Sequence, residues 1–235
     1  MKNPKKGNTF LVFFGIFFAV CMVGLAAYVT VFLNTDQTIL APESTDVLIS
    51  APEETAAAET LSQTDTFLAS HSLLFLGDSR TAGMRNALAE LGVSDPCSYL
   101  AKDGEGCYWL RNTALPELTA RLDQEPDTIV ITNLGVNDLT ECASYLSLYH
   151  DLLERYPTTP FYIMSVNPAS DDCSMVANAD IESFNQTMQD EFPDLYFDCY
   201  HYLMDNGYET VDGLHYTQET YAKIYDYAIK EAAGR

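Results

Sequence analysis

Short apolar runs alternate with amphipathic stretches from residue 73 to the end of the 235-residue chain. The strands expected from this pattern are Leu73–Leu76, Ser98–Ala101, Thr128–Leu134, Phe161–Val166 and Leu195–Cys199. The expected helices are Ala82–Leu91, Tyr108–Leu122 (interrupted at Pro116), Ala143–Tyr156, Asp180–Phe192 and Thr217–Ala233. Residues 128–131 are β-branched and continuously apolar, which is typical of a strand buried on both faces.

Strand–helix alternation at this spacing predicts a parallel sheet with helices on both sides. Five strands within residues 67–235 predict a flavodoxin-like three-layer α/β/α sandwich. In open parallel sheets, ligands bind outside the carboxyl ends of the strands. Four polar segments each follow an expected strand, and a fifth precedes the last helix: Gly77–Arg80, Asp103–Gly106, Gly135–Asp138, Val166–Pro168 and Asp212–His215. We therefore expect these segments to converge at one edge of the sheet.

The amino-terminal residues have a different character. Lys2, Lys5 and Lys6 precede an uncharged apolar run from Phe10 to Leu33, and every Asp and Glu lies after it. A run of this length can cross a hydrocarbon core of about 30 Å as a helix. The positive-inside rule then predicts a cytoplasmic tail at 1–9, a transmembrane signal anchor at 10–33 and an extracytoplasmic remainder. The competing interpretation is a cleavable signal peptide, whose apolar core is usually shorter, about 7–15 residues.

Acidic residues dominate everything after the apolar run. Residues 34–66 contain seven acids, no bases and many Thr, Ala, Ser and Pro, which predicts a solvated flexible stalk rather than a core. Residues 67–235, the expected folded domain, carry 27 acids against nine bases, a net charge of −18. Such a surface argues against a nucleic-acid partner, because phosphate binding needs basic patches.

Five cysteines lie beyond the apolar run, and no two have the Cys-x-x-Cys spacing of a zinc or redox site. Cys97–Cys107 and Cys173–Cys199 are possible disulfides between which the sequence does not choose. For Cys199, which lies within an expected apolar strand, we favour a buried free thiol. The four histidines show no metal-ligand spacing such as His-Glu-x-x-His. No phosphate loop or dinucleotide fingerprint follows the first strand, so we expect neither metal nor cofactor.

Four short motifs occupy the expected strand ends and the final loop. They are Gly77-Asp78-Ser79, a loop with two glycines at Gly104 and Gly106, Gly135-Val136-Asn137-Asp138, and Asp212-Gly213-Leu214-His215. In this order they resemble the sequence blocks of SGNH hydrolases, also called the GDSL-type esterase/lipase family. The chain departs from the family name at Arg80, where the family has leucine. The resemblance implies a serine esterase that needs no cofactor.

Each part of the expected site has a chemical reason. A sharp strand-to-helix turn exposes the Ser79 hydroxyl as a nucleophile, and an imidazole such as His215 can take its proton near neutral pH. Asp212 would orient the ring and offset its developing charge. The resemblance assigns the oxyanion donors to the Ser79 N–H, a glycine N–H of the second motif and the Asn137 amide. We favour Gly106 over Gly104, because a helical pattern resumes after Gly106.

The same residues also have ordinary structural interpretations. Ser79 is a preferred helix N-cap residue, and Asn137-Asp138 is frequent in turns. Further residues are weaker candidates for substrate contact. Gly104 lies in the glycine loop, Arg80 could bind an anionic group or pair with a nearby acid, Trp109 could stack on a sugar or belong to the core, and Asn167 could line the cleft or form a turn with Pro168.

The expected function is a membrane-anchored extracytoplasmic serine esterase that hydrolyses small acyl esters, acetyl above all, on carbohydrate. The substrate class follows from the resemblance and the expected location, not from any one residue. One alternative is an O-acyltransferase that passes the acyl group to a cell-envelope polysaccharide. A single membrane span, instead of a many-helix acyl-donating domain, favours hydrolysis. A second alternative is a non-catalytic glycan-binding domain, which would show a broken triad.

Overall fold

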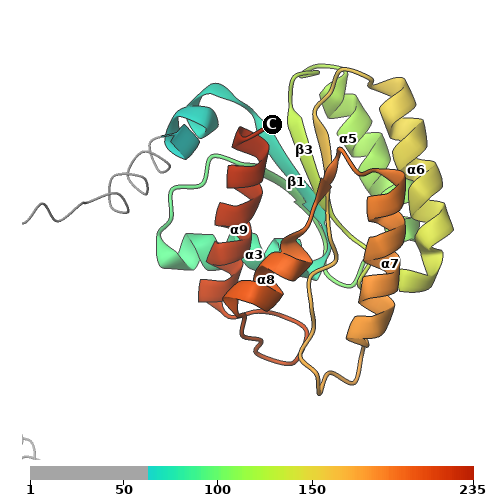
Figure 1. The fold of residues 1–235 in the computed structure, drawn as a ribbon. Helices are drawn as coiled ribbons and strands as arrows, with labels where there is room; N and C mark the ends of the chain where they lie inside the picture. Colours follow the sequence, from blue (N-terminus) through green and yellow to red (C-terminus); the bar gives the residue numbers. More distant parts are fainter. Residues whose placement is uncertain (1–62) are drawn as a thin grey trace, which may run out of the picture. The chain divides into compact units, whose positions relative to one another are not determined.

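One parallel sheet organises the described part of the chain. The computed structural model describes residues 63–235, and within them five strands lie in the order β2-β1-β3-β4-β5 (Figure 1). The strands are β1 (Leu73–Gly77), β2 (Ser98–Ala101), β3 (Ile129–Asn133), β4 (Phe161–Met164) and β5 (Tyr196–Phe197). All pairings between neighbouring strands are parallel. The sequence-based expectation of a five-stranded doubly wound sheet is therefore confirmed.

Helices cover both faces of this sheet. The elements on one face are α3 (Ser79–Leu91), α8 (Cys199–Asn206) and α9 (Gln218–Ala233). The elements on the other are α4 (Cys107–Trp109), the π-helical η1 (Leu110–Ala114), α5 (Leu115–Leu122), the 3-10 turn η2 (Leu139–Glu141), α6 (Cys142–Arg155) and α7 (Asn178–Glu191). Figure 1 shows α3, α8 and α9 grouped apart from α5, α6 and α7, with β1 and β3 between them.

The central strands alternate between two hydrophobic clusters. In β1, Leu73 and Phe75 pack with α3 and α9, whereas Leu74 and Leu76 pack with the helices of the opposite face. Successive strand side chains point to opposite faces, so a strand covered on both sides must be apolar throughout. This requirement explains the continuous apolar runs in the sequence.

The observed boundaries differ from the expected ones at three informative places. Helix α3 starts at Ser79 rather than at residue 82. Pro116 causes no interruption, because it lies in the first turn of α5, where a missing N–H costs little. The expected strand 195–199 ends at Phe197. It is followed by helix α8, which the sequence analysis missed. Asp198 caps this helix by accepting the His201 N–H at 3.2 Å.

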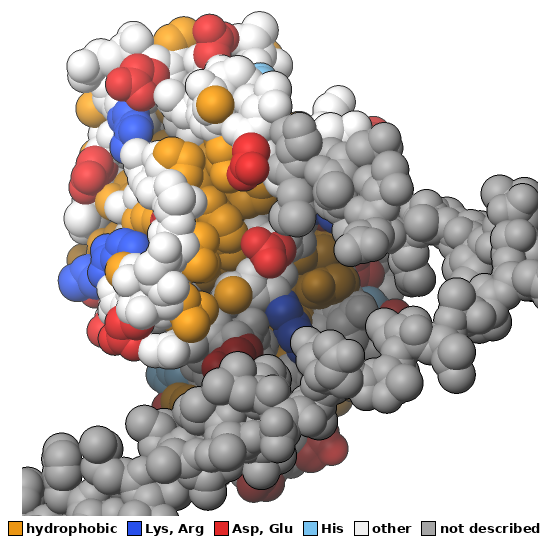
Figure 2. Space-filling view, turned by 90° about the vertical axis from the view of Figure 1, so that its left-hand side faces the viewer, with side chains coloured by type: hydrophobic (Ala, Val, Ile, Leu, Met, Phe, Trp, Pro, Cys, Tyr) orange, Lys and Arg blue, Asp and Glu red, His pale blue; other side chains and the backbone are white. Residues whose placement is uncertain are grey.

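The expected membrane anchor falls outside the described residues, together with the tail and most of the stalk. Within residues 63–235, no helix is long and apolar enough to cross a bilayer. Residues 63–70 are helical, so this helix runs across the boundary expected between stalk and domain at 66/67. Its Phe67 and Leu68 pack against the α3–α9 cluster. Figure 2 views the molecule from the left-hand side of Figure 1. On this face hydrophobic side chains are gathered, with acidic and basic groups scattered around them.

The cysteines of residues 63–235 are all free thiols. Cys107 and Cys173 belong to the α5–α7 side of the sheet, whereas Cys97 and Cys199 belong to the α3–α9 side. The sheet therefore separates the members of both disulfides considered above, and those pairings are wrong. Cys199 is fully buried, and burial raises the pKa of its thiol well above the usual value.

Candidate active site

Ser79, His215 and Asp212 form a hydrogen-bonded chain at the carboxyl edge of the sheet. The Nε2 atom of His215 lies 2.8 Å from Ser79 Oγ, across 136 positions of sequence. The other ring nitrogen, Nδ1, lies 2.8 Å from Asp212 Oδ2. A carboxylate at Nδ1 favours the tautomer that carries its proton there, which leaves Nε2 to accept the serine proton. The structure thus brings together the three residues expected to form the triad.

A direct turn from β1 into α3 presents the serine. Gly77 ends the strand, and a Cβ atom there would collide with the Thr81 side chain, so only glycine permits this approach. The N-cap of α3 is Asp78, whose Oδ1 accepts the backbone N–H of Arg80 at 2.9 Å. The capping role considered for Ser79 is filled by its neighbour. The Ser79 hydroxyl is left to bond to His215.

The loop before α9 fixes the other two members. Asp212 Oδ1 accepts the backbone N–H groups of Leu214 and His215 at 2.9 and 2.7 Å. Gly213 between them has a φ of +88°, a conformation that favours glycine. Burial acts to raise the pKa of Asp212, but hydrogen bonds from the His215 backbone, the His215 ring and the Leu214 N–H outweigh it and lower the pKa to about 2. Asp212 is therefore a carboxylate throughout the range in which histidine titrates.

The second and third motifs meet beside this chain. Asn137 Nδ2 donates one hydrogen to the Glu105 carbonyl oxygen at 2.7 Å, so its second amide hydrogen remains for another acceptor. A Cβ atom at Gly106 would collide with the Asp138 carboxylate, whereas one at Gly104 would meet open space. Gly104 instead has a φ of +71° and shapes the exposed turn. Of the two glycines, Gly106 is the one in contact with the Gly-x-Asn-Asp loop.

Two backbone donors at these helix starts are unpaired. Within residues 63–235, no hydrogen bond is formed by the N–H of Ser79, the first residue of α3, or by that of Gly106, the N-cap of α4. Unsatisfied N–H groups at a helix start are suited to a negatively charged oxygen. Together with the Asn137 amide, they are the donors that the family resemblance names.

Asp138 supports the meeting of these loops, a role the sequence analysis did not assign. Its Oδ2 accepts the Cys107 backbone N–H at 2.6 Å, and its Oδ1 accepts the Tyr145 hydroxyl at 2.7 Å. The carboxylate thereby joins the loop after β3 to the start of α4 and to α6. The sequence feature that could have indicated this role is the position of Asp138 directly after Asn137 in the third motif.

Arg80, Asn167 and Trp109 are buried, which contradicts their expected substrate contacts. Trp109 belongs to the core of the α5–α7 side and offers no exposed ring face for a sugar. Arg80 is 3% exposed, and its Nη1 donates to the Asn167 carbonyl oxygen at 2.6 Å. Its guanidinium carbon also lies 5.2 Å from the centre of the Tyr216 ring. Arg80 therefore links the nucleophile turn to the 167 and 216 loops. Among residues 63–235 no acid forms an ion pair with it, although its charge acts to lower the pKa of the neighbouring Asp78 carboxyl.

A pocket of about 450 Å³ opens beside Asn137 and Asp138. It lies between the loop after β3, η2, the segment around Met175 and the first turns of α7. A second pocket, of about 490 Å³, lies between α5 and α6. None of the triad residues lines either pocket, but the first is lined by Asn137. Residues 63–235 contain no group of three or more His, Cys, Asp or Glu side chains placed to hold a metal ion.

The sequence matches no protein-family model and no curated protein. Its fold is similar to that of a GDSL-like lipase from Bacteroides thetaiotaomicron, with a TM-score of 0.55, 17% identity, and coverage of 77% of this chain and 96% of the lipase. It is also similar to an acetyl-xylooligosaccharide esterase from Geobacillus stearothermophilus (TM-score 0.51, 16% identity, 71% and 95% coverage). A protein provisionally named as an SGNH hydrolase, from Slackia heliotrinireducens, matches with a TM-score of 0.51, 18% identity, and 69% and 97% coverage.

These neighbours define the class of structure. Residues 63–235 have the fold of SGNH hydrolases, so the resemblance drawn from the four motifs is confirmed at the level of the fold.

Proposed function

We propose that this protein is a serine ester hydrolase that cleaves small acyl esters, above all acetyl esters on carbohydrate, through Ser79, His215 and Asp212. The observation that carries the proposal is the continuous chain from Ser79 Oγ through both ring nitrogens of His215 to the Asp212 carboxylate, with both distances 2.8 Å. Nucleophile, base and orienting carboxylate in this geometry are the requirements of acyl transfer through serine.

The reaction proceeds in two halves. Ser79 Oγ attacks the ester carbonyl carbon while His215 Nε2 takes the hydroxyl proton, and the carbonyl oxygen becomes an oxyanion. The N–H groups of Ser79 and Gly106 and the free Asn137 amide hydrogen stabilise this oxyanion. Protonated His215 then gives its proton to the departing alcohol, which leaves an acyl group on Ser79. Water, deprotonated by His215, hydrolyses that acyl-enzyme and restores the serine.

The carbohydrate part of the proposal rests on a structural neighbour and on the expected location. The similarity to an acetyl-xylooligosaccharide esterase supports an acetylated sugar as substrate. The apolar run at 10–33 would fix the enzyme to the outer face of the cell membrane, with the acidic segment 34–66 as its stalk.

An O-acyltransferase would use the same acyl-enzyme, with a sugar hydroxyl in place of water. The exposure of the triad favours water: the side chains of His215 and Asp212 are 34% and 49% exposed. An acyl-enzyme beside an open histidine meets solvent before it meets a dilute sugar acceptor. A non-catalytic glycan-binding role is disfavoured, because it would leave no reason for an intact triad beside unpaired oxyanion donors.

The deciding experiment is a time course of p-nitrophenyl acetate cleavage by the full-length protein. Sustained turnover is expected, and it should vanish in Ser79→Ala. The matched control is Ser94→Ala, an exposed serine beyond the far end of α3, which should keep full activity. Thermal unfolding of both variants shows whether the fold is retained. A single stoichiometric burst would instead indicate a transferase that awaits an acceptor, and release independent of Ser79 would refute the proposed nucleophile.

A further inference from the structure

The pocket beside Asn137 adjoins the proposed oxyanion site through that residue. Asn137 and Asp138 line it, and the same two side chains bond to Glu105 and Cys107 in the second-motif loop. β1 and β3 are paired so that Gly77 lies opposite Asn133. Ser79 follows one of these residues by two positions and Asn137 follows the other by four. A substrate held by Ser79 and Asn137 therefore has this pocket as its neighbouring space.

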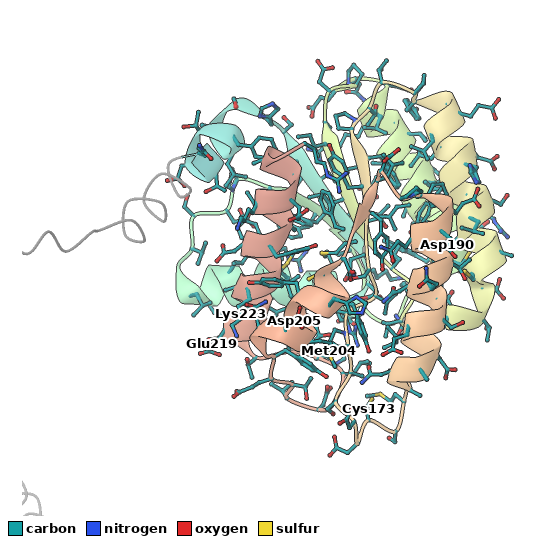
Figure 3. The ribbon with its side chains drawn as sticks, in the orientation of Figure 1. Cys173, Asp190, Met204, Asp205, Glu219 and Lys223 are labelled. Carbon is teal, nitrogen blue, oxygen red and sulfur yellow. The ribbon has the colours of Figure 1, made fainter. Side chains whose placement is uncertain are left out.

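The opposite wall is supplied by the segment that leads into α7. Figure 3 labels Cys173 in this segment, below the first turn of α7, and Met175 and Val176 come directly after it. The Met175 side chain is 60% exposed, although it is large and apolar. Val176 and Leu139 add further apolar surface to the pocket. Exposed apolar groups gathered beside a reactive site are characteristic of ligand contact.

The polar groups of the pocket are the Asn137 amide, carboxylates and hydroxyls, without a cation. Asp180, Thr140 and Ser183 line it, and no Lys, Arg or His does. The Asp180 side chain has no hydrogen-bond or ion-pair partner within residues 63–235, and it lies in the first turn of α7, where a carboxylate is favoured. A carboxylate facing an unoccupied space is an acceptor for ligand hydroxyl groups.

This combination selects a chemical class of ligand. A sugar ring has hydroxyl groups that donate to carboxylates and a C–H face that packs on side chains such as those of Met175 and Val176. The pocket volume of about 450 Å³ far exceeds an acetyl group and falls within the usual range of small-molecule sites. A uronate, sulfate or phosphate group would face Asp180 and Asp138 with no opposing cation, and like charges at such range repel.

We propose that the pocket between the Gly135–Asp138 loop, η2 and α7 binds an uncharged sugar unit of the substrate, with Asp180 as acceptor for its hydroxyl groups and Met175 against its C–H face. This inference rests on the proposed esterase function and adds its specificity. The enzyme would thus discriminate against acetylated sugars that carry carboxylate groups, because the Asp180 carboxylate repels such groups and accepts hydrogen bonds from hydroxyl groups.

The test compares three substrates: acetylated xylooligosaccharide, acetylated oligogalacturonate and p-nitrophenyl acetate. The wild-type protein should prefer the neutral oligosaccharide. Asp180→Ala should raise KM for it about ten-fold, the effect of one hydrogen bond to a charged group, with kcat unchanged. Turnover of p-nitrophenyl acetate, which has no sugar, should stay the same. Asp180→Lys should shift the preference toward the oligogalacturonate.

The matched control is Asp151→Ala, because Asp151 lines the pocket between α5 and α6 instead. It should change none of the three activities. Unchanged KM values in Asp180→Ala, or a wild-type preference for the carboxylated substrate, would overturn the inference about the sugar site. Sustained turnover of p-nitrophenyl acetate in the same experiments would show that the esterase function itself still holds. Binding of unacetylated xylooligosaccharide to Ser79→Ala, measured by calorimetry, decides the matter without catalysis: Asp180→Ala in that background should weaken binding, and equal affinity would refute the inference.

Discussion

Asp78 accepts the backbone N–H of Arg80 at 2.9 Å, and because of this hydrogen bond the intervening Ser79 is not needed as the N-cap of α3. A helix start needs a side-chain acceptor, and a serine at the first turn commonly supplies it. Here the carboxylate before the serine is the cap. The hydroxyl of Ser79 is thereby free to face His215.

Asp78 should also make stability depend on pH. The side chain is 1% exposed, and burial raises its pKa to about 6, against the lowering effects of the Arg80 guanidinium and N–H. Because this pKa lies above that of the unfolded chain, the stabilising contribution is complete below about pH 4 and is lost as pH rises through 6. Asp78→Asn keeps a good cap and should remove this part of the dependence, on the order of 3 kcal/mol between the two limits. Urea unfolding of both proteins from pH 4 to 7 measures it, and parallel curves would contradict it.

Asp212 should affect rate without setting the acid limit of activity. Its pKa of about 2 keeps it ionised from pH 4 to 9, so the dependence of kcat/KM on pH over this range should contain no proton that belongs to Asp212. Asp212→Asn should lower kcat by about 10³–10⁴, because an amide favours the wrong tautomer of the ring. Steady-state kinetics from pH 4 to 9 test both statements. A second proton in the acid limb of the wild type that disappears in Asp212→Asn would show that Asp212 titrates in this range.

Gly106 and Gly104 can be separated by substitution. A Cβ atom at Gly106 would collide with the Asp138 carboxylate, so Gly106→Ala must displace either the N–H or the loop that carries Asn137. We expect kcat to fall by about 10²–10³, the usual cost of an oxyanion donor. The control is Gly104→Asn, which tolerates the positive φ and enters open space, and it should retain activity. Equal losses in both variants would show that loop shape, not the Gly106 N–H, is responsible.

Arg80 should be replaceable without loss of stability once Asp78 is neutral. Its guanidinium is buried, and its Nε and Nη2 atoms have no hydrogen-bond partner among the described residues. A buried cation with unmet donors carries a desolvation cost that an apolar side chain of similar length avoids. In the Asp78→Asn background, where no buried carboxylate loses its neighbouring cation, Arg80→Met should therefore change the free energy of unfolding by less than about 1 kcal/mol, or increase it. Chemical denaturation checks this, and a loss of several kcal/mol would mean that the Asn167 and Tyr216 contacts outweigh the desolvation cost.

The fold was largely predictable because its central strands are buried on both faces. A continuous apolar run such as 128–131 has one simple explanation in an alternating α/β sequence, and all five strands were expected within a few residues of their positions. The missed helix α8 has a different cause. Its first residues, Cys199 and Tyr200, are as apolar as the strand before them, and only the Asp198 cap marks the change.

The site was less evenly predictable. Ser79, Asp212 and His215 could be predicted because each lies in a short motif whose residues are close together in the sequence. Burial is not local: Arg80 and Trp109 look like ligand contacts in the sequence, but the sheet and the 167 loop enclose them. The pocket that includes Asp180 is formed by segments some forty positions apart in the sequence, so no short sequence pattern predicts it.

The five separate thiols have a consequence for where the domain can exist. Since no covalent bridge connects the two sides of the sheet, its fold makes no demand on the redox state of its surroundings. The same packed unit would form in a reducing or an oxidising compartment.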